Sequence, residues 1–397
     1  MSSAGKRRIV LIVLSIGALC ATVARADAVT DWNIKSSEVL VEARLATQPA
    51  VRVMAIVQTA AHRAVVTASH RGSSVEAALA ASHRATLVRL LPAQESMVEA
   101  AYQAALSAVA DGAFKFDGLA DGEAAAQAVL TARADDGAAA PETYRPHTTA
   151  GAYVPTTTPA VTQWPQRRPW LMQNAAQFRP AGPPALSSQA WARDFNEVKA
   201  MGGRASTRRT SEQTDIARFW DYSAPPIYHA LVRSVAQQPG RSLERNARLF
   251  AAVAQAMDDA LIPVFDAKYH YQFWRPVTAI RNADLDGNDA TEREAGWSSL
   301  IDVPMHPEYP AAHSVLASSL GTVLAAEVGT GPQPVLTTSS PTAKGVARTY
   351  LSIDALVQEV ANARIWGGVH YRTATEVGTR MGRQVGDLAV AWLRAAP

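Results

Sequence analysis

Apolar residues recur at intervals of three and four positions along most of the chain, the period of amphipathic α-helices. The pattern is clear over the alanine-rich residues 36–136 and again over residues 187–397. Capping signals accompany it, because Ser36 offers an N-cap in the first stretch and a capping-box pattern begins at Thr210 in the second. Alternation of period two, typical of half-buried strands, is nowhere sustained. The pattern therefore predicts an all-α fold, a helical bundle with long loops.

Residues 137–186 differ in composition from both helical stretches. They are rich in Pro, Thr, Gly and Ala, and large apolar side chains such as Trp164, Trp170 and Phe178 interrupt them. Pure linkers lack such groups. We therefore expect an ordered loop that wraps the domain, with a flexible linker between domains as the alternative. The predicted divisions are a 27–136 helical region, the 137–186 loop and a 187–397 helical domain.

The first 26 residues have the pattern of a signal peptide. A basic segment at Lys6 precedes an apolar run, and Ala24-Arg25-Ala26 is a small-x-small cleavage site. The mature chain is then predicted to begin at Asp27 and to be exported, either periplasmic or secreted; a retained anchor is the alternative. The single cysteine, Cys20, would leave with this segment, so the mature chain would have no disulfide.

Charge and hydropathy exclude two further classes of protein. Of the 397 residues 48% are hydrophobic and 18% charged, an ordinary globular balance. The formal net charge is +3, but without residues 1–26 it is −1, with 34 basic and 35 acidic side chains, and no basic run remains. We therefore expect no nucleic-acid partner. No apolar run long enough to span a bilayer follows residue 26.

The first segment that carries chemistry ends in Lys268-Tyr-His-Tyr-Gln-Phe-Trp-Arg275-Pro276. Lys268 and Arg275 are seven residues apart, about two helical turns, so both are expected to project from one face of a helix. Pro276 restricts Arg275 and ends that helix. Two cations at a helix end suit an oxyanion, whereas a solvated basic face is the alternative.

The second segment is His306-Pro307-Glu308-Tyr309-Pro310-Ala311-Ala312-His313. Pro310 is a suitable first residue for a helix. Backbone N–H groups of Ala311 and Ala312 would then face an anion at the helix N-terminus, with His313 placed to exchange a proton with it. A capped helix with an incidental histidine is the alternative.

The third segment contains Arg364 and His370, on either side of a helix end at Gly367-Gly368. A new helix is expected to begin with the Thr373-Ala-Thr-Glu376 capping box. Glu376 is therefore interpreted as the third-position partner of this capping box and not as a catalytic group.

The order K-x6-R-P, then P-x-x-P-small-small-H, then R-x5-H resembles the vanadium-dependent haloperoxidase and type 2 phosphatidic acid phosphatase superfamily. The residues around Arg275 and His370, together with the long helical N-terminal half, are most similar to bacterial vanadium haloperoxidases. Membrane-embedded lipid phosphatases are disfavoured, since no span is expected.

The resemblance implies a role for each matched position. Lys268, Arg275 and Arg364 would bind the oxygens of vanadate, the implied cofactor, whose site phosphate can also take. The Ala312 amide would donate a further hydrogen bond. His313 would be the acid–base group, and His370 the axial ligand of vanadium or the nucleophile toward phosphorus.

Three positions depart from the family pattern. Ala311 stands where a serine is usual and lacks its hydroxyl, which weakens the expected hold on vanadate. Ala374 stands where phosphatases often carry an aspartate that orients the nucleophile. His306 stands where algal bromoperoxidases have histidine and the fungal chloroperoxidase type has phenylalanine, which favours bromide over chloride.

The leading hypothesis is therefore oxidation of halide by hydrogen peroxide with vanadate. The alternatives are an exported acid phosphatase that acts on phosphate monoesters through a phosphohistidine, and an oxyanion-binding protein without turnover. A homo-oligomer is left open.

Overall fold

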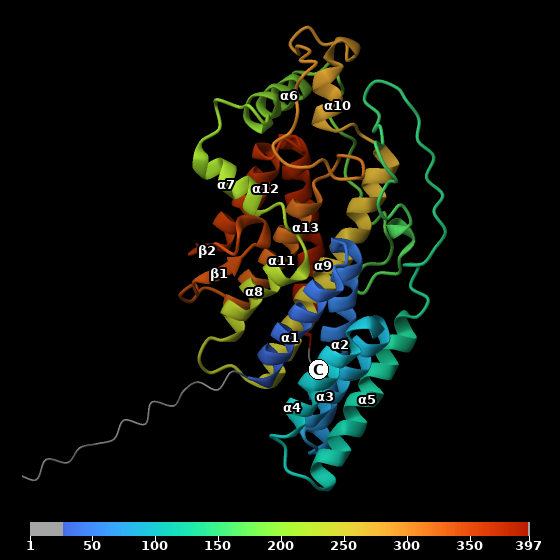
Figure 1. The fold of residues 1–397 in the computed structure, drawn as a ribbon, viewed down its shortest axis with the longest axis vertical. Helices are drawn as coiled ribbons and strands as arrows, with labels where there is room; N and C mark the ends of the chain where they lie inside the picture. Colours follow the sequence, from blue (N-terminus) through green and yellow to red (C-terminus); the bar gives the residue numbers. More distant parts are fainter. Residues whose placement is uncertain (1–26, 396–397) are drawn as a thin grey trace, which may run out of the picture.

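The computed structural model describes residues 27–395, and the predicted signal peptide, residues 1–26, lies outside the described residues (Figure 1). The fold is mostly helical, as predicted. Its elements, in chain order, are α1 (Ala28–Ala43), α2 (Thr47–Arg71), α3 (Val75–Leu90), α4 (Glu95–Leu106), α5 (Ala113–Arg133), α6 (Gln189–Gly202), α7 (Ser211–Phe219), α8 (Pro225–Ala236), α9 (Leu243–Tyr271), α10 (Pro276–Arg281), α11 (Ala312–Val328), β1 (Leu336–Ser339), β2 (Ala347–Tyr350), α12 (Ile353–Trp366) and α13 (Arg372–Arg394).

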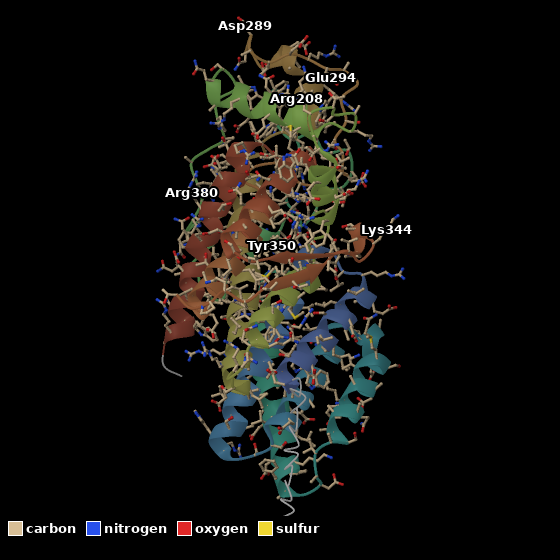
Figure 2. The ribbon with its side chains drawn as sticks, turned by 90° about the vertical axis from the view of Figure 1, so that its left-hand side faces the viewer. Arg208, Asp289, Glu294, Lys344, Tyr350 and Arg380 are labelled. Atoms are coloured by element: carbon tan, nitrogen blue, oxygen red, sulfur yellow. The ribbon has the colours of Figure 1, made fainter. Side chains whose placement is uncertain are left out.

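Helix α9 is the central element of the bundle. It packs against α2 on the N-terminal side of the chain and against α11 and α13 on the C-terminal side. Figure 1 shows α3, α4 and α5 at the lower end and α6 and α10 at the upper end. Figure 2 shows Arg208, Asp289 and Glu294 at this upper end. Among the described residues no helix is both long and apolar enough to cross a membrane.

A short antiparallel ribbon departs from the all-α expectation. Strand β1 pairs with β2, with Leu336 opposite Tyr350, and Figure 2 shows Tyr350 about midway along the molecule. Four residues on each side are too few for a period-two pattern to be recognised in the sequence.

Helix boundaries match the capping signals in part. The capping box of Thr210 and Gln213 is present at the start of α7. The expectation for Ser36 was wrong, because Asp27 caps α1 and Ser36 lies inside the helix, where its hydroxyl donates to the Trp32 carbonyl. Serine can satisfy its hydroxyl in this way within a helix.

Residues 137–186 are attached to α9 by buried polar contacts. Arg167 forms an ion pair with Asp258 at 2.5 Å, with both side chains fully buried. The Asp259 carboxylate accepts backbone N–H groups of Trp170 and Leu171, both at 2.7 Å. Such charge-assisted bonds to a central helix fix the position of the segment.

Helices α11 and α13 approach closely because of glycines. Gly378, Gly382 and Gly386 lie four residues apart on α13 and therefore share one face. A Cβ atom on Gly382 would lie 2.3 Å from the Val315 carbonyl oxygen of α11, and one on Gly378 would lie 2.6 Å from that of Ala311. Only glycine permits this approach, which brings the start of α11 next to the start of α13.

Candidate active site

Four segments converge in the upper half of Figure 1, at the ends of α9, α10, α11 and α12. They bring together the charged and imidazole groups predicted from the sequence, and one carboxylate that was not. The His370 cluster is defined by these residues: Lys268, Arg275, His306, Glu308, His313, Arg364 and His370.

Lys268 is fully buried and holds the loop that precedes α11. Its ammonium donates to the carbonyl oxygens of Pro307 at 2.9 Å, Glu308 at 2.7 Å and Pro310 at 2.5 Å. Burial, with the nearby Arg275 charge, holds its pKa well below the usual value. These bonds match the three donors of an ammonium group, so Lys268 acts on the site through its charge and through the loop.

The placement of Arg275 differs from the prediction of one helix spanning Lys268 and Arg275. Helix α9 ends at Tyr271, Gln272 takes a left-handed conformation, and Arg275 is the extended N-cap of α10. Pro276 is the reason, because it disfavours the helical region for the residue before it and suits the first turn of the next helix. The two cations still meet, but from two elements.

Each nitrogen of the Arg275 guanidinium contacts protein acceptors. Nε donates to the His306 carbonyl at 2.9 Å, and Nη1 donates to the Val369 carbonyl at 2.8 Å. Nη2 lies 2.9 Å from Nδ1 of His306 and 3.3 Å from the Pro307 carbonyl. Nη1 also lies 3.3 Å from Nε2 of His370. Burial lowers the Arg275 pKa to about 10, so the group stays charged at neutral pH.

His370 has a carboxylate partner that sequence reasoning missed. Its Nδ1 lies 2.7 Å from Oε1 of Glu308, a residue with no exposed surface. Burial raises the Glu308 pKa to about 7, opposed by Lys268 and Arg275. Burial and the same two cations hold the His370 pKa well below its usual value, so the imidazole is neutral. The sequence signal that could have indicated this contact is Glu308 itself, the acidic residue two positions after His306 in the second of the three motifs.

Arg364 lies near the end of α12 and is 1% exposed, and its guanidinium makes fewer hydrogen bonds than that of Arg275. Nη1 donates to the Trp220 carbonyl at 2.9 Å, whereas Nε is buried without a hydrogen-bond partner among the described residues. Burial lowers its pKa to about 10, partly offset by Asp221. A buried donor without a partner costs free energy, so Arg364 has capacity for a ligand.

His313 and the first turn of α11 add further unused donors. Helix α11 begins at Ala312 rather than at Pro310, with Ala311 as the N-cap. Nε2 of His313 and Oγ of Ser314 have no partner among the described residues. Burial, followed by the charges of Arg364, Lys268 and Arg275, holds the His313 pKa well below its usual value. His313 is therefore neutral, at a helix end that favours anions.

Ala311 does not match its predicted part in binding. Its amide donates to the Ala374 carbonyl at 3.0 Å, and its fully buried side chain is a methyl group. It therefore offers no free donor, because the close contact between α11 and α13 takes its N–H. The Ala312 amide, one residue later, is the first of the helix.

The expected capping box at Thr373 and Glu376 is absent. Helix α13 begins at Arg372 with Tyr371 as its N-cap and no side-chain capping bond. The Thr373 amide donates instead to Asp194 of α6 at 2.9 Å. Glu376 is exposed on α13. A buried carboxylate from another helix thus satisfies the first turn.

The donors and charges of this cluster fit a tetrahedral oxyanion such as vanadate or phosphate. Three buried cations surround His370. The buried atoms here without a hydrogen-bond partner among the described residues are Nε of Arg364, Nε2 of His313, Oγ of Ser314 and the carboxylate oxygen Oε2 of Glu308. A buried polar atom without a partner calls for an explanation, and a bound anion would explain the donors gathered here.

Comparison with known proteins gives sequence matches in the same part of the chain. A family model described as the VCPO second helical-bundle domain matches residues 248–396. The vanadium chloroperoxidase of Curvularia inaequalis is 31% identical over 174 residues, which cover 36% of this chain and 28% of that protein. The match thus spans less than a third of the chloroperoxidase.

Solved structures show the fold over nearly the whole chain. A bacterial vanadium-dependent iodoperoxidase superposes with a TM-score of 0.78 at 24% identity, covering 91% of this chain and 95% of its own. A holo-type bacterial vanadium-dependent chloroperoxidase superposes with a TM-score of 0.71 at 18% identity, covering 90% and 92%. The match of the C-terminal helices in sequence and of nearly the whole chain in fold confirms the predicted resemblance to vanadium haloperoxidases.

Proposed function

We propose that the protein binds vanadate in the His370 cluster and oxidises halide with hydrogen peroxide. The observation that carries this proposal is the set of three buried cations around a neutral histidine, next to polar side-chain atoms at the start of α11 that have no partner among the described residues. The relatives named as vanadium-dependent iodoperoxidase and chloroperoxidase support it.

The proposed roles follow from which donors are free. Arg364 and the Ala312 amide would bind oxygens of the oxyanion, whereas Lys268 and Arg275 would supply positive charge from positions that the loop carbonyls fix. His370 would bond to vanadium through Nε2. When bound, vanadate supplies a Lewis acid that polarises peroxide toward attack by halide.

His313 would act as the acid–base group. Because its pKa lies well below the usual value, the imidazole is neutral at pH 7 and can accept a proton from a bound peroxide molecule. From the first turn of α11 it would lie beside the proposed oxyanion position.

His306 would bias the halide toward bromide over chloride. Its ring is buried, packs against Phe265 at 5.0 Å between ring centroids and accepts from Arg275. Its pKa is also held well below the usual value, by burial first, so it contributes a neutral polar ring. Iodide should be tested in the same assay, because one of the similar structures is that of an iodoperoxidase.

The second candidate function is hydrolysis of phosphate monoesters, and Glu308 favours it. Ala374 stands where phosphatases often carry the aspartate that orients the nucleophile. In this structure the Glu308 carboxylate contacts His370 instead. Nε2 of His370 would attack phosphorus as the ester P–O bond breaks. His313 would protonate the leaving alcohol once the negative charge of the bound phosphate has allowed it to take up a proton. Water would then cleave the P–N bond.

A paired assay on protein that begins at Asp27 tests both candidates. One arm follows bromination of a dye with bromide, chloride or iodide and peroxide after incubation with orthovanadate. The other follows hydrolysis of an aryl phosphate without vanadate. His370→Ala should abolish whichever activity is present, and His270→Ala, at an exposed histidine, should not.

The outcomes separate the hypotheses. Halide oxidation that His370→Ala removes supports the haloperoxidase. Phosphate release that vanadate inhibits supports the phosphatase. Vanadate binding without either activity identifies an oxyanion-binding protein without turnover. The predicted export is tested separately, by N-terminal sequencing of the protein recovered outside the cytoplasm.

A further inference from the structure

Glu308 is held against His370 by two hydrogen bonds to one oxygen atom. Its Oε1 lies 2.7 Å from Nδ1 of His370 and accepts the backbone N–H of Tyr371 at 3.0 Å. The carboxylate therefore contacts both the ring and the backbone that follows it. This pair of contacts fixes the ring relative to its own main chain.

The loop that carries Glu308 is itself fixed. Lys268 donates to the carbonyl oxygens of Pro307, Glu308 and Pro310, on both sides of the side chain in question. The Glu308 amide donates to the Phe273 carbonyl at 2.9 Å. The backbone that carries the Glu308 side chain therefore cannot move away from His370 without breaking a buried cation's hydrogen bonds.

The two neighbours of the ring select one tautomer of His370. A guanidinium can only donate, so the contact of Arg275 with Nε2 at 3.3 Å requires a lone pair on Nε2. The proton of the neutral ring then resides on Nδ1, where the Glu308 carboxylate accepts it. Both contacts favour the same tautomer.

We propose that Glu308 is a positioning residue that holds His370 in the Nδ1–H tautomer and keeps the Nε2 lone pair available for bonding. The inference rests on the proposed function only in that His370 would bond to vanadium or phosphorus. A ring with its proton on Nε2 could form neither bond. A carboxylate on the opposite nitrogen also raises the basicity of the bonding nitrogen.

The first test measures the tautomer without any ligand. Protein with ¹⁵N-labelled histidine is studied by long-range ¹H–¹⁵N correlation, and the His370 signals are assigned by their loss in His370→Ala. We expect a protonated Nδ1 and a bare Nε2 at neutral pH. A wild-type ring with its proton on Nε2, or with both nitrogens protonated, would overturn the proposal whatever the variants do.

Variants then test the part played by the carboxylate. Glu308→Leu removes the acceptor and should shift His370 to a mixture of tautomers. Glu308→Gln keeps an amide oxygen for the Nδ1 proton and should retain the wild-type tautomer. Glu376→Gln, at an exposed glutamate of α13, is the matched control and should change nothing. An unchanged tautomer in a folded Glu308→Leu protein would contradict the inference.

The second readout is the affinity for orthovanadate, measured by equilibrium dialysis. We expect Glu308→Leu to weaken binding about 10- to 100-fold, the usual effect of losing such a partner, and Glu308→Gln to weaken it less. Equal affinity for wild type and Glu308→Leu would overturn the proposal. A wild-type protein that binds no vanadate would refute the proposed function. The tautomers of wild type and Glu308→Leu would then decide by themselves whether Glu308 positions His370.

Discussion

The backbone N–H of Ala311 donates to the carbonyl oxygen of Ala374 at 3.0 Å, which ties the N-cap of α11 to the first turn of α13. His313 follows one of these residues and His370 precedes the other. The bond therefore joins the two segments that carry the histidines of the proposed chemistry, and it explains why the Ala311 amide is not available to a ligand.

A serine in place of Ala311 should strengthen oxyanion binding. The hydroxyl would add one hydrogen bond to a charged ligand, about 1.5–3 kcal/mol, or roughly tenfold or more in affinity. The dissociation constant of orthovanadate by equilibrium dialysis measures this. The control is Ala317→Ser, at a buried position further along α11. If the two variants bind alike, position 311 does not face the ligand.

Closer packing at Gly382 should be destabilising. A Cβ there would lie 2.3 Å from the Val315 carbonyl, so Gly382→Ala must move α13 away from α11. We expect the free energy of unfolding to fall by about 1–3 kcal/mol, the range for overpacked cores. Urea denaturation measures it. Gly296→Ala, where a Cβ would meet nothing within 4 Å, should leave stability unchanged; an equal loss in both would argue against close packing as the cause.

The two arginines of the cluster should respond differently to replacement by lysine. Arg275→Lys loses bonds to the carbonyls of His306 and Val369 among others, and should lower the free energy of unfolding by about 2–3 kcal/mol. Arg364→Lys breaks one carbonyl bond, so its stability should change little.

Replacing Arg364 by lysine should affect vanadate binding more than it affects stability. Its buried Nε has no hydrogen-bond partner among the described residues and would bind the proposed ligand, so Arg364→Lys should weaken affinity about tenfold or more while the protein remains folded. Thermal unfolding and equilibrium dialysis on the same preparations distinguish the two effects. A stable Arg275→Lys protein would show that its carbonyl bonds contribute little.

Acid should destabilise the N-terminal helices through His83. The ring is fully buried, stacks on Trp32 at 4.8 Å between centroids, and burial lowers its pKa to about 4. The unfolded chain binds the proton first, near pH 6.5, so stability falls as pH drops from there toward 4. The loss should reach about 2 kcal/mol by pH 5.

The His83→Phe variant removes this titration and keeps an aromatic ring on Trp32. Its free energy of unfolding, measured by urea at pH 7 and pH 5, should change less with pH than that of the wild type. Equal changes would show that His83 does not take up the proton.

The site illustrates where sequence reasoning succeeded and where it stopped. The spacing of Arg364 and His370 and the motif before His313 identified residues that the fold does bring together. The same reasoning put Lys268 and Arg275 on one helix, because spacing alone does not reveal the left-handed residue Gln272 between them. Glu308 was missed because its partner is 62 residues away along the chain.

By itself the sequence determined the helical class, the capping box at Thr210, the resemblance to vanadium haloperoxidases and most members of the His370 cluster. These depend on local period and on motifs that are read in order along the chain. The tertiary structure alone decided that the Ala311 amide donates to the Ala374 carbonyl, that Glu308 contacts His370, and that Lys268 donates to loop carbonyls. Such pairings depend on which distant backbone and side-chain groups meet in a buried space, where each donor must find an acceptor.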